Sequence, residues 1–355
     1  MLKQQLPITI KTLADFTRDA LGLNLDTSKN TGFDYVVDLL EASAYNTYLE
    51  TMGDKCDSLY RRIKESRSDL IIHSYLTTIK LLSKKLNLKQ RNLILAFDYT
   101  DEDFYGDVQG FFIHGAPKKD KRNGKFKFLT CNLVSDEIKQ RIPLLSVPIK
   151  LGHNMSREVL YILQLLNPYL GDIELLLFDR GFYSKELMLS LSNAQYNYLI
   201  FVPKDSAIKK QLDQMTVLER KLIPYNFEYS GDKTKHKGQT YLAFLKEIYS
   251  KTLDLKIDWV FSTNIEKINL DEIIKTYKKR WRIENSFKVQ DDALLKTKST
   301  NIKIRFFIFV FQQMLESLWY CFYKHEVTFK RFIIEISKKS IEMQVKHKAR
   351  KESED

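Results

Sequence analysis

The chain has 355 residues, of which 44% are hydrophobic, with 12 glycines and 7 prolines, which excludes collagen-like and low-complexity architectures. This length favours one core with additions, or two to three domains. A formal net charge of +12 favours a polyanionic partner, with nucleic acid ahead of an anionic membrane surface. The 3 cysteines are far apart and form no CxxC pair, so we expect neither a disulfide framework nor a zinc site, and we expect a cytoplasmic location.

The first part of the chain is predicted to be helical. Apolar side chains recur at helical spacing in residues 34–40 and again in residues 69–76. No residue in this part has a catalytic pattern. We therefore predict a helical N-terminal domain over residues 1–90.

The pattern changes after residue 90 to short apolar runs that are typical of buried strands. Two of these runs, residues 92–98 and 173–179, each end in an aspartate, Asp98 and Asp179. A predicted helix over residues 157–166 separates them, and further helix and strand patterns follow. Because strands alternate with helices, residues 91–205 are predicted to form the first part of an α/β core.

The alternation stops in residues 206–265, where short strand patterns surround a glycine-containing turn, and we predict a β-rich insertion there. Residues 266–335 are predicted to complete the core with two helices, at 270–296 and 303–323. Residues 336–355 form a basic C-terminal tail.

The helix predicted over residues 303–323 is apolar enough to resemble a membrane span. Its middle, however, carries Gln312, Gln313 and Glu316, which are expensive at the centre of a bilayer. We therefore interpret it as a buried helix of a large core and expect no membrane partner.

The predicted helix around residue 284 presents an acid between potential phosphate-binding groups. At about 100° per residue, Tyr277, Arg280, Glu284, Lys288 and Asp291 fall within an arc of about 80°. A metal-binding carboxylate bordered by cations needs such a face. The alternative for this face is a solvated helix surface with i,i+4 ion pairs. The alternative for Asp98 and Asp179 is that each is a turn residue or a helix cap.

Together these segments resemble the DDE transposases of the insertion-sequence-four family. Members carry an Asp at the end of the first strand and a second Asp in a D-R-G-[FY] turn, here residues 179–182. Their third acid follows the pattern Tyr-(two)-Arg-(three)-Glu-(six)-Lys, here Tyr277, Arg280 and Glu284. The lysine position of that pattern is occupied by Asp291, and Lys288 lies one turn earlier on the same face.

The resemblance implies an α/β fold with an RNase H-like mixed sheet flanked by helices, a β-rich insertion before the last catalytic helix, and the N-terminal helical domain. It implies that Asp98, Asp179 and Glu284 are catalytic residues that bind two Mg²⁺ ions, with Mn²⁺ as a substitute. DNA-binding roles are expected for five residues, namely Tyr277, Arg280, Lys288, Arg180 and Trp281.

The implied reaction is cut-and-paste transposition, in which a metal-dependent endonuclease cuts the transposon ends and a strand transferase joins them to target DNA. The implied partners are double-stranded DNA with terminal inverted repeats, target DNA, and a second copy of the chain in a synaptic homodimer. DNA-end recognition is assigned to residues 1–90, and the cytoplasmic location is expected to be nucleoid-associated.

Two other functions share these features. A metal-dependent, structure-specific nuclease of the same fold would use similar acids. A catalytically inactive, transposase-derived DNA-binding protein would keep the charge and the fold, and Asp291 in the lysine position favours this alternative.

Overall fold

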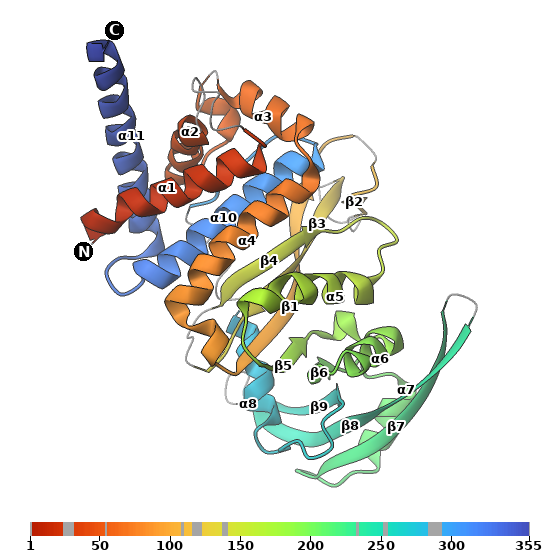
Figure 1. Ribbon diagram of the computed structural model, residues 1–355. Coiled ribbons are helices and arrows are strands. Elements are labelled where there is room, and N and C mark those ends of the chain that lie inside the picture. Colours follow the sequence, from red (N-terminus) through yellow and green to blue (C-terminus); the bar gives the residue numbers. More distant parts are fainter. Residues whose placement is uncertain are drawn as a thin grey trace.

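The computed structural model describes residues 2–23, 32–53, 55–107, 110–115, 123–136, 141–231, 234–250, 255–282 and 293–354. Within these ranges the elements, drawn in Figure 1, are, in chain order, α1 (Leu2–Ala20), α2 (Gly32–Ala44), η1 (Leu49–Thr51), α3 (Lys55–Glu65), α4 (Ser68–Leu86), η2 (Leu88–Gln90), β1 (Leu93–Phe104), β2 (Ile113–His114), β3 (Gly124–Leu133), β4 (Ile142–Pro148), α5 (Met155–Leu166), η3 (Asn167–Tyr169), β5 (Ile173–Phe178), η4 (Arg180–Phe182), α6 (Lys185–Asn193), β6 (Tyr198–Phe201), α7 (Ser206–Asp213), β7 (Arg220–Gly231), β8 (Thr234–Ser250), β9 (Leu255–Thr263), α8 (Ile273–Lys278), η5 (Lys279–Trp281), α10 (Ile302–Phe322) and α11 (Phe329–Glu354). The η elements are 3₁₀ helices.

A mixed sheet organises the fold. In the described part of the chain its strand order is β2-β3-β1-β5-β6-β9-β8-β7, and β4 pairs with β3. Strand β1 is antiparallel to β3 and parallel to β5, and β5 is parallel to β6. The predicted β-rich insertion is present as β7, β8 and β9, and it continues the main sheet because β9 pairs with β6. The hairpin of β7 and β8 extends away from the N-terminal helices α1 to α4 (Figure 1).

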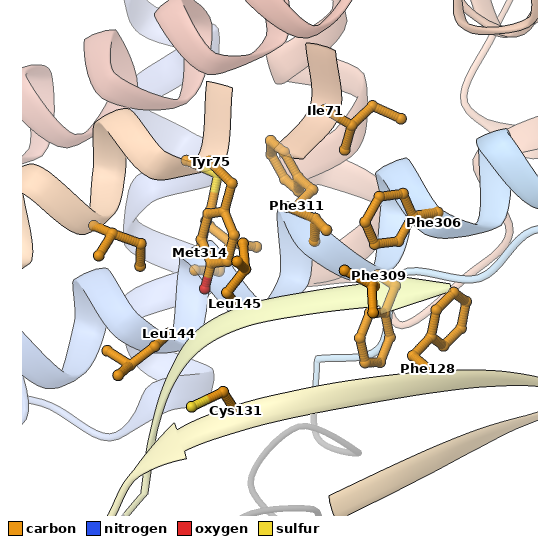
Figure 2. Packing of buried hydrophobic residues seen from close by; sticks show 14 of the residues in the cluster. Ile71, Tyr75, Phe128, Cys131, Leu144, Leu145, Phe306, Phe309, Phe311 and Met314 are labelled. Carbon is orange, nitrogen blue, oxygen red and sulfur yellow. The ribbon is translucent and has the colours of Figure 1, made fainter. Parts of the chain in front are cut away.

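The N-terminal helices share a continuous hydrophobic core with the sheet. Figure 2 shows Tyr75 of α4 beside α10 and the β3–β4 pair. Phe309 of α10 stacks on Phe128 of β3 with 4.2 Å between ring centroids, and Phe16 of α1 stacks on Phe307 at 5.5 Å. Helix α10 therefore lies between the first helices and the sheet and contacts both.

The prediction that residues 303–323 form a buried helix is confirmed by α10. Two polar side chains in its middle have partners inside the protein: Gln313 accepts a hydrogen bond from Ser146 at 2.6 Å, and Glu316 lies 3.7 Å from Arg141. Across the residues that the structure describes, no helix is long and apolar enough to cross a membrane.

The prediction of one helix over residues 270–296 is wrong. Helix α8 and η5 cover 273–281, residues 283–292 lie outside the described residues, and 293–300 are not helical. Lys296 instead forms a β-bridge with Tyr48. The basic segment 336–355 is helical through Glu354 as the end of α11, and α11 packs against α1 and α2.

Candidate active site

Asp98 and Asp179 lie next to each other on neighbouring parallel strands. The pairing of β1 with β5 ends at Phe97 and Phe178, and each aspartate is the next residue. The prediction that the first strand ends at Asp98 is wrong, because β1 continues to Phe104 along its antiparallel partner β3. Asp98 thus lies where the pairing of β1 with β5 ends, next to the position of Asp179.

The residues that follow the two aspartates pack on each other. Tyr99 and Phe182 stack with 4.7 Å between ring centroids, and Phe182 is almost fully buried. The backbone N–H of Tyr99 donates to Oδ1 of Asp98 at 2.9 Å, and the N–H of Phe182 donates to the carbonyl oxygen of Asp179 at 3.0 Å. The aromatic residue of the D-R-G-F turn therefore anchors the second acid against the first strand.

Arg280 connects both carboxylates. Its Nη1 lies 3.5 Å from Oδ2 of Asp98, and its Nη2 lies 3.8 Å from Oδ1 of Asp179. The Arg280 side chain is 7% exposed, and its Nε donates to the hydroxyl oxygen of Tyr277 at 3.3 Å. One buried guanidinium thus faces two acids and is oriented by a tyrosine one turn earlier.

Electrostatics at this pair favour a cation. Burial raises the pKa of Asp98, the Arg280 charge opposes the rise, and the negative charge of Asp179 adds to it. Paired carboxylate oxygens are ligands that suit Mg²⁺ or Mn²⁺, so the donor set fits a divalent cation. Among the described residues, no cluster of three acid, histidine or cysteine side chains is available to hold a metal.

Three further acids, Asp101, Glu102 and Asp103, follow Asp98 in β1. Asp101 forms an ion pair with Lys125, and Glu102 lies 3.4 Å from Arg305. Burial raises the pKa of Glu102 to about 7, while Arg305 opposes the rise. Asp103 is exposed at the surface. The ion pairs of Asp101 and Glu102 are thus with other cations, whereas Asp98 and Asp179 face Arg280.

The structure places the predicted DNA-binding residues in different environments. Arg180 is exposed beside Asp179. Tyr277 is 1% exposed, and its ring lies 4.9 Å from that of Phe261, so the side chain is buried. Trp281 is partly buried, and its ring centroid lies 5.9 Å from that of Trp259.

Three predicted positions cannot be placed. Glu284, Lys288 and Asp291 lie outside the described residues.

Two neighbours of Arg280 that the sequence pattern did not single out attach η5 to the end of β3. Lys279 is nearly buried and lies 2.7 Å from Asp136, whereas Arg282 donates to the carbonyl oxygens of Val134 at 3.2 Å and Ser135 at 3.0 Å. The sequence shows that this segment is basic, but the partners of Arg282 lie 148 and 147 positions earlier, so no local signal identifies them.

A family of known proteins shares the sequence pattern of this part of the chain. The profile of the family described as "Transposase DDE domain" matches residues 108–312, more than half of the chain. This range includes Asp179 and Glu284 and begins after Asp98. No curated protein sequence matches the chain.

A solved structure has a similar fold. The cryo-EM structure of a piggyBac transposase synaptic complex with hairpin DNA aligns with a TM-score of 0.56 and 12% identity, over 94% of this chain and 77% of that chain. At this identity the similarity concerns the fold, and it confirms the RNase H-like mixed sheet.

Proposed function

Because the chain belongs to the transposase DDE domain family, we propose that it cuts DNA at transposon ends and transfers them to target DNA, as in cut-and-paste transposition. In this proposal it is a member of the insertion-sequence-four type with the Tyr-Arg-Glu-Lys signature, and Asp98, Asp179 and Glu284 are its catalytic acids. The observation that carries the proposal is the pair of carboxylates, Asp98 and Asp179, that share the Arg280 guanidinium.

Family membership implies dependence on a divalent metal, and we propose two Mg²⁺ ions, with Mn²⁺ as a substitute. Asp98 and Asp179 would hold them from adjacent strands, and Glu284 would complete the set. When bound, such a pair of ions activates the attacking oxygen and stabilises the leaving oxygen of a phosphodiester. Because Tyr99 and Phe182 fix the strand ends, the two carboxylates are held in place before DNA arrives.

The neighbouring cations have separate roles in the proposal. Arg180 is exposed next to Asp179 and is assigned to a DNA phosphate. Arg280 holds the two acids together, and Tyr277 orients Arg280 through its hydroxyl group. A phosphate contact is kept as a proposal for Lys288, while Trp281 is assigned to packing against the insertion.

The proposed partners are the DNA ends and the target DNA. The net charge of +12 suits backbone contacts, and the similar piggyBac structure is a synaptic complex with hairpin DNA. Synapsis of two ends would join two copies of the chain as a homodimer. We propose that residues 1–90 recognise the ends, that 91–205 and 266–335 form the catalytic core around the insertion 206–265, and that the basic end of α11 contacts DNA in a nucleoid-associated protein.

A strand-transfer assay with end-bearing DNA and a target plasmid distinguishes the alternatives. A transposase cuts the ends and joins them to the plasmid. A structure-specific nuclease cuts and never joins, and a DNA-binding relic binds the ends without cutting in either metal. Either of the last two outcomes would replace the proposal.

A further inference from the structure

His153, in the loop between β4 and α5, contacts the residue that follows Asp98. Its Nε2 atom lies 3.0 Å from the hydroxyl oxygen of Tyr99, and the two rings meet edge to face with 6.0 Å between centroids. The phenol and the imidazole share one hydrogen bond whichever ring nitrogen carries the proton. A side chain 54 positions further along the chain thus holds the Tyr99 ring from outside its strand.

Tyr99 in turn is connected to both proposed metal ligands. Its N–H donates to Oδ1 of Asp98 at 2.9 Å, and its ring stacks on Phe182 with 4.7 Å between centroids. Phe182 closes the turn after the second acid, since its N–H donates to the carbonyl oxygen of Asp179 at 3.0 Å. A shift of the Tyr99 ring would therefore disturb the packing at the second strand end as well as the backbone beside the first.

The loop that carries His153 is itself attached to the surrounding elements. The N–H of Ile149 donates to the carbonyl oxygen of Lys127 at 2.9 Å, which holds the start of the loop on β3. Asn154, the N-cap of α5, donates from its side-chain amide to Oε1 of Glu186 on α6 at 2.8 Å. His153 is therefore supported by β3 and by the helix that follows the D-R-G-F turn.

The imidazole of His153 carries no charge at mildly alkaline pH. Burial lowers the pKa of His153, a hydrogen bond to the backbone of Lys150 opposes the shift, and the neighbouring His114 and Lys127 add to it. The ring is therefore neutral at pH 8. Its replacement by an uncharged side chain leaves the charge near the two acids unchanged, so an effect on them would come from position.

We propose that His153 is a positioning residue for Asp98 and Asp179. It acts through Tyr99, which orients the first carboxylate by its backbone and supports the turn after the second by its ring. This inference rests on the proposed role of the two aspartates as metal ligands. Groups that orient a ligand without touching the metal change metal affinity by about 10–100-fold when they are removed. Since His153 acts through Tyr99, its effect belongs at the lower end of this range.

The test is the affinity of the full chain for Mn²⁺ alone, measured by electron paramagnetic resonance at pH 8 without DNA. We expect His153→Ala and Tyr99→Phe each to weaken Mn²⁺ binding by about tenfold, because each removes the same hydrogen bond. The double variant should bind no more weakly than either single variant, because the two residues act as one unit. His153→Gln keeps a hydrogen-bonding group for the Tyr99 hydroxyl and should bind within about threefold of the wild type.

His114→Ala is the matched control. Nε2 of His114 donates to the carbonyl oxygen of Ile149 at 2.8 Å, at the start of the same loop. This variant removes a histidine contact of the loop but keeps the hydrogen bond between His153 and Tyr99, so it should bind Mn²⁺ like the wild type. If His153→Ala does not fold in a urea titration, Tyr99→Phe, which keeps the stacked ring, replaces it in the comparison.

Asp179→Ala separates the role of His153 from the metal site itself. Unchanged affinity in Asp179→Ala would overturn the proposed metal site. A loss in Asp179→Ala together with unchanged affinity in His153→Ala would overturn the role of His153 alone. Fully additive effects in the double variant, or an equal loss in His114→Ala, would also overturn that role.

Discussion

The Nη1 atom of Arg280 lies 3.5 Å from Oδ2 of Asp98, so a guanidinium carried by η5 neutralises a carboxylate carried by β1. The Nη2 atom of the same guanidinium lies 3.8 Å from Oδ1 of Asp179. A divalent cation held by Asp98 and Asp179 would neutralise the same two carboxylates. The arginine and the metal are therefore expected to have overlapping electrostatic roles at this site.

Arg280→Gln should lower stability without metal and increase the response to metal. The substitution leaves two neighbouring carboxylates without their shared cation, and we expect a loss of about 2 kcal/mol in the free energy of unfolding. Because Mg²⁺ binding relieves the repulsion, the rise in Tm on titration with Mg²⁺ should be larger in the variant than in the wild type. Arg180→Gln, at the exposed neighbouring position, is the control, and an equal Mg²⁺ response in all three proteins would contradict the expectation.

Glu102 predicts a pH dependence of stability. Its pKa is raised from 4.5 to about 7 in the folded protein, so the folded state binds more protons than the unfolded state between these values. Its contribution is therefore fully present below pH 4.5 and is lost as the pH rises to about 7. Since a quarter of the side chain is exposed, we expect a change of about 1 kcal/mol.

Glu102→Gln removes this titration and keeps an acceptor for Arg305. Relative to the wild type, the variant should gain about 1 kcal/mol between pH 4.5 and pH 8, as measured by urea unfolding. A stability difference that is constant across this range would show that burial does not perturb Glu102.

The buried pair of Arg141 and Glu316 should be sensitive to single substitutions. Both side chains are almost inaccessible to solvent. Glu316→Leu removes the carboxylate that faces the buried guanidinium of Arg141, and we expect a loss of about 3–5 kcal/mol. The double variant Arg141→Met/Glu316→Leu should recover most of this loss. Calorimetry that finds the double variant no more stable than the single one would contradict this reasoning.

Tyr277 is expected to act from inside the core. Tyr277→Ala removes a buried ring and should lower stability by about 3–5 kcal/mol, whereas Tyr277→Phe keeps the ring but removes the acceptor of Arg280 Nε and should lower stability by about 1–3 kcal/mol. Fluorescence anisotropy with end-bearing DNA should give the same affinity for Tyr277→Phe as for the wild type. A weaker affinity at unchanged stability would restore the phosphate contact implied by the family resemblance.

The sequence predicted the α/β core well because burial and chain alternation leave a strong local pattern. The apolar runs before Asp98 and Asp179 correspond to the buried, parallel-paired parts of β1 and β5. The run ends at Asp98 although the strand does not, because only the neighbour β5 stops there. A hydrophobic pattern indicates which residues are buried. The length of β1 also depends on its pairing with β3, and no local sequence pattern reveals that pairing.

The helix predicted through residue 296 failed for a related reason. Lys296 lies in a sequence with good helix formers, yet its backbone pairs with Thr47 and Leu49. Tertiary hydrogen bonds of this kind override helix propensity, which is weak per residue. Likewise, the helical spacing placed Arg280 near an acid. Its contacts with Asp98 and Asp179 join residues that are far apart in the sequence, so no local pattern predicts them.

The most direct test of the catalytic assignment is metal-dependent cleavage of duplex DNA that carries the element's own ends. Wild type is compared with Asp179→Asn and Glu284→Gln, and DNA affinity is measured for each protein. We predict cleavage by the wild type in Mg²⁺ or Mn²⁺, a loss of at least about a hundredfold in each variant, and unchanged DNA binding. A wild type that binds the ends and cuts in neither metal, or variants that cut as well as the wild type, would contradict the assignment.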